Sequence, residues 1–294
     1  MAVILDGKKV AQEIKKQLKE EINTYLSKGL RSPTLAVILV GNDPASKVYV
    51  KNKRQSCEEV GIKSIYMHFP EETPEEEILR IIDKLNKDDD VDGILVQLPL
   101  PRHINTSNII MAINPEKDVD GFHPENVGKL ATGLKDAIIP CTPLGVWILL
   151  KKYEIQTYKK DVVIVGASNI VGKPMSLLFL RNEEATITVC HKNTKNLEKH
   201  TKEAEILIVA VGKPNLITAD MVKEGAVVVD VGINKLEDGK LVGDTDFEKI
   251  KEKASAITPV PGGVGPMTVA SLLVNTLSIY RQKFGFSKHP LTDI

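Results

Sequence analysis

The chain has 294 residues, of which 42% are apolar and 27% are charged, and its 39 basic side chains balance its 39 acidic ones. At roughly 100 to 200 residues per domain, this length predicts about two domains. The composition excludes a disordered chain, and without a surplus of positive charge we expect neither nucleic acid nor an anionic membrane as a partner.

The sequence predicts neither a membrane span, nor a signal peptide, nor a disulfide framework. No window approaches the ~20 uninterrupted apolar residues of a membrane span, and the first residues become charged too soon for a signal peptide. The cysteines Cys57, Cys141 and Cys190 are odd in number and widely spread, which favours a reducing compartment over a disulfide framework. Neither CxxC nor HxxxH occurs, so we expect no metal site. The sequence thus predicts a cytoplasmic protein.

In the first part of the chain, buried apolar runs alternate with amphipathic stretches. Apolar residues at fourfold spacing predict a surface helix over about 8–28. Thr73-Pro74-Glu75-Glu76 combines a capping box with Pro at the first helical position, so another helix should start there. The remaining expected elements are a strand over 35–40, a helix over 46–60, a strand over 64–69 and a strand over 92–98 that Pro99 ends.

Turn-rich sequence from about 115 to 145 interrupts this pattern, and we place the domain junction there. Beyond it, four strand candidates recur at regular intervals with helix-length segments between them, which is typical of a parallel sheet with helices on both faces. They are Val162–Val165, Ala185–Cys190, Ile206–Ala210 and Ala226–Val231. A further strand over 257–260 and a closing helix over 266–284 complete an α/β protein.

A glycine-bearing turn follows the strand at 162–165. Gly166 stands where a dinucleotide fingerprint needs its tight turn, whereas Ser168 replaces the second glycine and Gly172 comes one residue late. The strand–turn–helix context suits a pyrophosphate at the helix N-terminus. The next strand ends in His191-Lys192 without a carboxylate for the ribose hydroxyls of NAD, which favours NADP. The alternatives are a plain turn and a solvated loop lysine.

Three polar features of the first half stand out. Gln97 ends an apolar strand, so its amide should emerge at the carboxyl edge of a sheet, where open α/β folds bind ligands. Tyr49 and Lys53 are four residues apart and share a face of the expected helix. Asp120 lies in an Asp-Gly turn. Taken singly, each feature also has an ordinary interpretation as a packed tyrosine, a solvated lysine or a turn.

Six segments together closely resemble the bifunctional methylenetetrahydrofolate dehydrogenase/methenyltetrahydrofolate cyclohydrolase family, in matching order and spacing from Asp6 to the closing helix. They are GNDPAS (41–46) with Tyr49 and Lys53, VQLPLP (96–101), KDVDGF (117–122), PCTP (140–143), GASNIVG (166–172) and PVPGGVGPMT (259–268). The resemblance implies a catalytic domain over 1–140 and 269–294, a Rossmann-type NADP-binding domain over 141–268, and folate in the cleft between them. It also implies a homodimer that acts on tetrahydrofolate derivatives.

The resemblance assigns roles residue by residue. Lys53 matches the family's catalytic lysine, Gln97 is its partner, Tyr49 stacks on the folate ring system and Asp120 binds the pterin. Further folate contacts are implied at Val96, Leu98, Pro261, Gly262, Gly263, Val264 and Gly265. The implied NADP contacts are Thr142, Gly166, Ala167, Ser168, Ile170, Gly172, Lys192, Ile233 and Thr268. Ala167 replaces an arginine that some relatives use toward the adenosine phosphate, which leaves that contact to Lys192 or Ser168.

The implied reaction belongs to one-carbon metabolism and purine biosynthesis, and it has two steps. Oxidation of the methylene bridge removes a hydride and requires positioning against the nicotinamide more than an acid or a base. Hydrolysis of the methenyl cation requires water to lose a proton, for which Lys53 would be the base and Gln97 its uncharged partner. Two alternatives stay open: another NADP-linked dehydrogenase of a small acid, and a non-catalytic nucleotide-sensing module.

Overall fold

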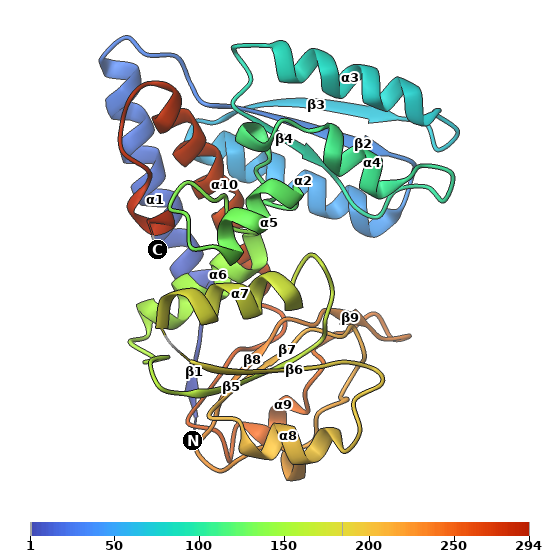
Figure 1. Ribbon diagram of the computed structural model, residues 1–294, viewed down its shortest axis with the longest axis vertical. Coiled ribbons are helices and arrows are strands. Elements are labelled where there is room, and N and C mark those ends of the chain that lie inside the picture. The colour runs from blue at the N-terminus through green and yellow to red at the C-terminus, as the bar shows by residue number, and fades with distance from the viewer. Residues whose placement is uncertain (1, 184, 294) are drawn as a thin grey trace. The chain divides into compact units, whose positions relative to one another are not determined.

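A computed structural model describes residues 2–183 and 185–293, and these form two compact units (Figure 1). The six-stranded unit consists of the N-terminal residues up to Ala11 together with 130–133 and 142–268. The three-stranded unit consists of 12–129, 134–141 and the residues from Val269 onward. This division differs from the expected domains at the N-terminus, because the short strand β1 (Val3–Ile4) pairs with β11 (Ala256–Ile257) of the larger sheet. The domain boundaries given above stay a prediction.

The three-stranded unit is built on a parallel sheet of order β3-β2-β4. Its strands are β2 (Thr34–Val40), β3 (Lys63–Phe69) and β4 (Gly93–Val96). Its helices are α2 (Pro44–Val60), α3 (Glu75–Lys87), α4 (Thr106–Ala112) and most of α1 (Gly7–Ser27), α5 (Pro124–Ala131) and α10 (Val264–Lys283), with 3-10 turns at Pro115–Lys117 and Pro290–Thr292. The alternate residues Ala36, Ile38 and Val40 of β2 pack against α3 and α4 in one apolar core.

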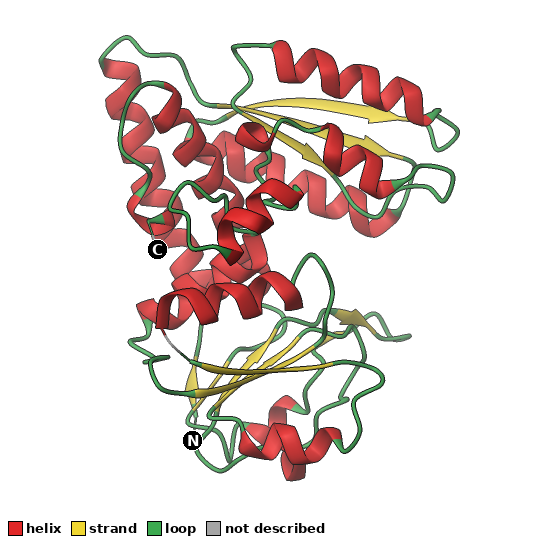
Figure 2. Ribbon diagram, viewed as in Figure 1, coloured by secondary structure: helices red, strands yellow, loops and turns green. Residues whose placement is uncertain are grey.

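The six-stranded unit is a parallel sheet of order β1-β11-β8-β7-β5-β6. Its longer strands are β5 (Asp161–Val165), β6 (Thr186–Cys190), β7 (Ile206–Val209) and β8 (Val227–Asp230), and a small hairpin joins β9 (Asn234–Lys235) to β10 (Leu241–Val242). Helix α7 (Gly172–Glu183) covers one face, and α8 (Leu197–Glu203) and α9 (Phe247–Ile250) cover the other, as Figure 2 shows. Helix α6 (Cys141–Lys152) and a 3-10 turn at Ala219–Met221 complete this unit. Strands covered on both faces explain why β5, β7 and β8 are almost entirely apolar.

Four local predictions need correction. The predicted capping box at Thr73 is wrong, because Pro74 is the N-cap of α3 and no side chain makes a capping hydrogen bond there. Glu75, Glu76 and Glu77 occupy the first turn instead, where they interact favourably with the helix dipole. The strand expected over 92–98 and the one expected over 257–260 are shorter, and the turn-rich stretch from 115 to 145 contains α5 and the start of α6.

Hydrogen bonds to β2 continue just beyond both ends of β4. Asp92 precedes the strand, and its amide donates to the Thr34 carbonyl at 3.0 Å, while its buried carboxylate accepts two hydrogen bonds from Arg31, at 2.6 and 2.7 Å, and one from the Thr34 amide at 2.8 Å. A buried carboxylate needs such partners to offset the loss of water. At the other end, the Gln97 amide still donates to the Ile38 carbonyl at 2.9 Å, so the ladder ends just beside that residue.

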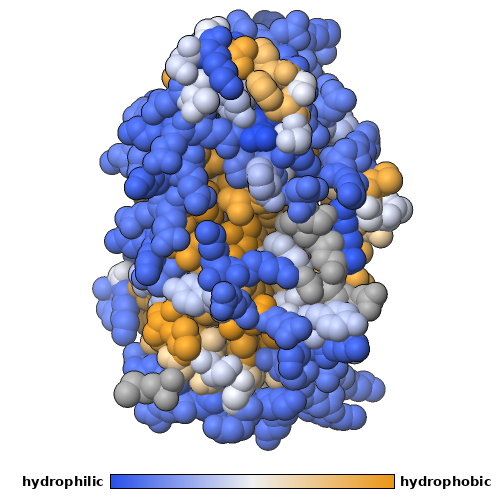
Figure 3. Space-filling view, turned by 90° about the vertical axis from the view of Figure 1, so that its left-hand side faces the viewer, coloured by the Kyte–Doolittle hydropathy of each residue, from blue (hydrophilic) through white to orange (hydrophobic). Residues whose placement is uncertain are grey.

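Three further features concern the surface, the helices and the cysteines. Hydrophilic side chains cover most of the face seen in Figure 3. Within residues 2–183 and 185–293, no helix combines the length and the apolar character needed to cross a membrane. Cys57, Cys141 and Cys190 are all buried free thiols.

Candidate active site

Helix α2 places Tyr49 and Lys53 one turn apart. The Asp43 carboxylate caps the helix by accepting the Ser46 amide proton at 2.7 Å, and Pro44 begins its first turn. Gly61 ends the helix in the left-handed conformation, with its N–H donating to Cys57 and Glu58. These caps account for the Asp-Pro and Gly signals in the sequence and fix the helix that carries both residues.

Gln97 meets Lys53 from the carboxyl end of β4. The Lys53 ammonium Nζ donates to Gln97 Oε1 at 3.0 Å, while Gln97 Nε2 donates to the Leu98 carbonyl at 2.6 Å. Because the amide nitrogen is held by that carbonyl, the amide oxygen is directed at the lysine. The structure thus brings together two residues that stand 44 positions apart and that the sequence assigned to one site.

Asp120 reaches the same place from the loop at 118–122. An isolated parallel bridge joins Ile94 to Asp118, and this close approach depends on Gly93, since a Cβ at that position would lie 2.3 Å from Val119 Cγ1. The buried Asp118 carboxylate holds the loop by accepting N–H protons from Gly121 and His123. The loop therefore runs along β4 and carries Asp120 toward the end of that strand.

The electrostatics of this cluster centre on Asp120. Burial raises the pKa of Asp120 to about 6, the positive charge of Lys53 lowers it, and the nearby Asp118 raises it further. Burial likewise raises the pKa of Asp118 despite its hydrogen bonds from His123 and Asn126. A carboxylate with a pKa close to neutrality is typical of a functional site.

The other expected folate residues of this unit lie around the same point. Val96 and Leu98 line a small pocket together with Asp120 and Phe122. Tyr49 is 42% exposed on α2, so its ring is available to a planar ligand. The cluster of Tyr49, Lys53, Val96, Gln97, Leu98 and Asp120 is termed the lysine cluster below.

Sequence reasoning missed two residues that brace the lysine cluster. Asn275 of α10 is 2% exposed and donates from Nδ2 to the carbonyls of Val119 and Ile139, each at 2.9 Å. The Cys141 thiol lies 3.3 Å from the Val119 carbonyl and 3.8 Å from Asp120 Oδ1. Burial raises the pKa of Cys141 well above its usual value, so it stays a thiol donor. A single asparagine within the apolar run of α10 was the available signal.

The six-stranded unit carries the glycine-bearing turn at the carboxyl end of β5. Gly166 has φ +125°, and a Cβ there would lie 2.2 Å from the Ala210 carbonyl oxygen, so only glycine fits between the two strand ends. The Ser168 hydroxyl accepts the Val171 amide proton at 3.1 Å, just before α7 begins at Gly172. Ser168 and Ile170 are exposed on this turn, which leaves a backbone cradle of the kind that receives a pyrophosphate.

The remaining expected NADP residues lie on the same edge of this sheet or at the start of two helices. Lys192 is exposed in the turn after β6, and Ile233 follows β8. Gly265 packs against Ile233, with 3.3 Å between its ideal Cβ position and Ile233 Cδ1, so the 261–265 segment adjoins one of the expected NADP contacts. The hydroxyls of Thr142 and Thr268 are 3.0 Å apart and join α6 to α10. Ala167 carries no polar side chain, as its sequence implied.

Among residues 2–183 and 185–293, no three His, Cys, Asp or Glu side chains are grouped so that they could hold a metal ion.

The six-stranded unit is a doubly wound parallel sheet with a glycine-bearing turn at its carboxyl edge, and the other α/β unit of the chain carries a Lys–Gln–Asp cluster. Together these features define an NAD(P)-linked enzyme of two parts. The family model for the tetrahydrofolate dehydrogenase/cyclohydrolase catalytic domain matches residues 5–120, and the model for the NAD(P)-binding domain of the same family matches residues 140–284. The chain belongs to the tetrahydrofolate dehydrogenase/cyclohydrolase family.

Individual relatives agree with this assignment. The bifunctional protein FolD of Sulfurihydrogenibium sp. is 65% identical over 281 residues, which cover 96% of this chain and 98% of the relative. The crystal structure of FolD, a methylenetetrahydrofolate dehydrogenase/cyclohydrolase, from Campylobacter jejuni has a TM-score of 0.94 at 55% identity and covers 96% of this chain and 99% of that one. The enzyme of Trypanosoma brucei, solved with NADP cofactor and inhibitor, has a TM-score of 0.92 at 36% identity, with 96% and 98% covered.

Proposed function

We propose that the lysine cluster binds the folate and carries the hydrolytic half of a two-step reaction, and that the carboxyl edge of the six-stranded sheet binds NADP. The chain is an NADP-dependent methylenetetrahydrofolate dehydrogenase and a methenyltetrahydrofolate cyclohydrolase. The substrate is oxidised to methenyltetrahydrofolate and then hydrolysed to formyltetrahydrofolate. Membership of the family supports the reaction, and the geometry supports the assignment of residues.

The first step needs little from acid–base chemistry. The methylene carbon lies between two nitrogens, so loss of a hydride leaves a cation that both nitrogens stabilise, and the enzyme's task is to orient the reactants. Bound NADP would supply the acceptor for that hydride. Gly166, Ser168 and Gly172 would hold its pyrophosphate at the start of α7, and the fit of this group is supported by the exposed turn at 168–170 that leads into that helix. Lys192 would meet the additional phosphate of NADP.

The second step requires proton transfer. Water adds its oxygen to the methenyl carbon and gives one proton to Lys53 Nζ, after which a C–N bond breaks as the hydroxyl proton moves to the departing nitrogen. Lys53 can take up this proton only as the neutral amine. Gln97 Oε1 accepts one Nζ hydrogen at 3.0 Å, which leaves the lone pair of the neutral amine free for the water.

Asp120 has a different task in this scheme. Its carboxylate only accepts hydrogen bonds when ionised, and the pterin ring presents amino and ring N–H donors. Asp120 therefore orients the ring, while Tyr49 offers an aromatic face. The loop at 118–122 is held by Asp118 and braced by Asn275, so the carboxylate is positioned before the substrate arrives.

The observation that carries the proposal is the Lys53–Gln97 hydrogen bond beside Asp120. The test is to mix the purified protein with methylenetetrahydrofolate and NADP and to follow NADPH formation and then the decay of the methenyl product. Both signals are expected. Reduction of NADP by a small hydroxy acid but not by the folate would favour another dehydrogenase, and NADP binding without turnover would favour a sensor.

We further propose that the protein works as a homodimer in the cytoplasm. Three buried free thiols support a reducing compartment. Light scattering coupled to size-exclusion chromatography measures the mass of the assembly, and a mass of one 32.4 kDa chain at micromolar concentration would contradict the dimer.

A further inference from the structure

A second buried carboxylate cluster lies in the six-stranded unit, and the reaction described above does not use it. Asp244 is fully buried in the segment that follows β10. Its Oδ2 accepts N–H protons from Val211 at 2.7 Å and Gly212 at 3.0 Å, and its Oδ1 accepts those of Lys213 at 2.8 Å and Asn234 Nδ2 at 2.9 Å. One carboxylate thus receives three consecutive backbone amides and one side-chain amide.

Asp244 is itself rigidly held. Its amide donates to Asp230 Oδ1 at 3.0 Å, and its carbonyl accepts the Ile217 amide proton at 3.0 Å. Gly232 makes room for the carboxylate, since a Cβ at that position would lie 2.2 Å from Asp244 Cγ. A fully buried carboxylate whose own backbone is hydrogen-bonded, and which accepts from four donors, defines the positions of those donors closely.

The donors belong to two loops at the functional edge of the sheet. The segment 211–213 follows β7, and Asn234 comes directly after Ile233, an expected NADP contact. In the order β7-β5-β6, the chain leaves β5 through α7 on one face and returns to β7 through α8 on the other. The topological switch point is therefore between β5 and β7, and ligands of such sheets bind in the crevice at their carboxyl ends.

The two walls of that crevice are the glycine turn after β5 and the loop after β7. They approach closely, because the Ala210 carbonyl occupies the space beside Gly166 where a side chain would be. The loop after β7 is exposed at 211–213, and Asp244 accepts hydrogen bonds from all three of its backbone amides. Loss of these hydrogen bonds would therefore free both the 211–213 loop and the Ile233–Asn234 segment from their present conformations.

We propose that Asp244 is a positioning residue of the dinucleotide site: it holds the 211–213 loop and the Ile233–Asn234 segment in the conformation that receives NADP. This inference rests on the proposed placement of NADP at the carboxyl edge of the sheet. It assigns Asp244 no contact with the cofactor and no part in hydrolysis of the methenyl substrate, which consumes no dinucleotide.

The test is Asp244→Asn, which keeps the shape of the side chain. Whichever way the new amide is turned, its NH₂ group faces two of the four donors, so two hydrogen bonds are lost. We expect the Kd for NADP, measured by calorimetry, to rise at least tenfold and the KM for NADP to rise with it. In the free protein, hydrogen exchange of the amides at 211–213 should speed up. Hydrolysis of methenyltetrahydrofolate, which reports an intact fold, should stay within about twofold of wild type.

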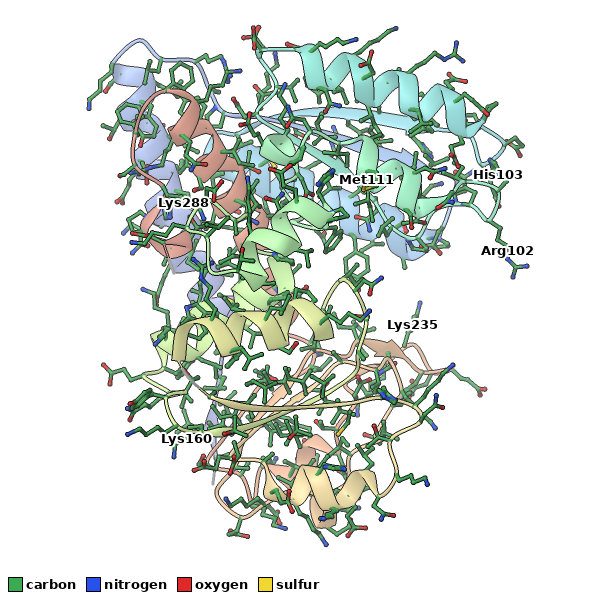
Figure 4. All side chains as sticks on the ribbon, in the orientation of Figure 1. Arg102, His103, Met111, Lys160, Lys235 and Lys288 are labelled. Carbon is green, nitrogen blue, oxygen red and sulfur yellow. The ribbon has the colours of Figure 1, made fainter. Side chains whose placement is uncertain are left out.

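Gly232→Ala is a second variant, because its methyl group displaces the Asp244 carboxylate without removing it, and it should weaken NADP binding in the same direction. The matched control is Glu205→Gln at the opposite edge of the same sheet. Glu205 lies at the amino edge of the sheet, where it accepts hydrogen bonds from the Lys160 ammonium at 2.7 Å and from the Asp161 amide at 3.1 Å. Figure 4 labels Lys160 at this edge and Lys235 toward the carboxyl edge. The control should leave the Kd unchanged.

Unchanged NADP binding in Asp244→Asn with hydrolysis intact would overturn the inference. A parallel loss of hydrolysis and NADP binding in both Asp244→Asn and Gly232→Ala would also overturn it, since Asp244 would then only support the fold. Failure of the wild type to bind NADP would instead contradict the proposed function, and that result is read before any variant is made.

Discussion

The lysine cluster differs from the carboxyl edge of the six-stranded sheet, the proposed NADP site, in the kind of groups that it presents to a ligand. The lysine cluster acts through side-chain groups, namely the Lys53 amine, the Gln97 amide and the Asp120 carboxylate. The carboxyl edge of the six-stranded sheet presents mainly backbone, with Gly166 packed against Ala210 and the 211–213 amides bonded to Asp244. In our proposal the first site combines one reacting group, the Lys53 amine, with groups that orient it and the substrate, whereas the second is a surface shaped for a ligand that supplies its own chemistry.

This difference has a consequence for mutation. Removing a reacting group should abolish one step and leave the other largely intact. Changing the carboxyl edge of the six-stranded sheet should lower the affinity for NADP without altering hydrolysis of the methenyl product. The two activities in one chain therefore provide an internal control for each other, and the following predictions use that contrast.

The largest expected effect concerns Lys53. Lys53→Met removes the proposed base, and loss of a positioned general base should slow methenyl hydrolysis by about 10² to 10⁴-fold. The rate of NADP reduction with methylenetetrahydrofolate should fall far less, because that step transfers no proton to the enzyme. The matched control is Lys51→Met, an exposed lysine two residues away on the same helix. Hydrolysis at the wild-type rate in Lys53→Met would refute the assignment.

The next effect concerns folate affinity. Asp120→Asn replaces one acceptor oxygen by a donor that faces the N–H groups of the pterin, which should weaken folate binding by about 3 kcal/mol or roughly 100-fold. Binding of NADP should be unaffected. Calorimetric titration of the variant with each ligand separately measures both values, and equal losses for the two ligands would contradict the role of Asp120.

A smaller effect is expected for cofactor choice. Lys192 is exposed, so its contact with the extra phosphate of NADP should contribute about 1.5 kcal/mol, or roughly tenfold in KM. Lys192→Ala should raise the KM for NADP and leave that for NAD nearly unchanged, and added salt should reproduce part of the loss. Lys199→Ala removes the same charge from α8 as a control. A variant with equal losses for NAD and NADP would shift attention to Ser168.

The smallest effect concerns stability. Burial raises the pKa of Asp120 from 3.8 to about 6, so the unfolded chain releases this proton at a lower pH than the folded chain. The ionised carboxylate therefore destabilises the fold progressively between about pH 4 and pH 6, and the cost is fully present above that range. Asp120→Asn should raise the free energy of unfolding by about 1 to 2 kcal/mol at pH 8 and by little at pH 4. Urea titrations at both pH values test this, and destabilisation at pH 8 would contradict it.

Much of the fold followed from the sequence because its signals are local. Apolar runs such as 162–165 and 206–209 appear as strands within about one residue of their expected ends, and the cap of α2 follows from Asp43-Pro44 and Gly61. Strand β1 was missed, because two residues that pair with a strand some 250 positions later carry no local pattern. The start of α3 was predicted one residue too early. Thr73-Pro74 fits a Thr N-cap followed by Pro at the first helical position as well as it fits the observed Pro74 N-cap.

The polar side chains of the lysine cluster were easier to predict than the buried residues that hold the loops of the two proposed sites. Lys53, Gln97 and Asp120 are polar groups in recognisable motifs, and the structure brings them together. Asp244 and Asn275 act on backbone amides and carbonyls far away in the sequence. Gly243-Asp244 is indistinguishable by local sequence from an ordinary turn, since the amides it gathers belong to a loop 31 to 33 residues earlier.

The pairing of β1 with β11 also bears on the order in which the chain is made. Val3 and Ile4 leave the ribosome some 250 residues before their partners Ala256 and Ile257. The edge of the six-stranded sheet therefore stays open until those partners have been made, because closing so long a loop must await its far end. A bulky group joined just ahead of Val3 would thus be attached beside an edge that forms late.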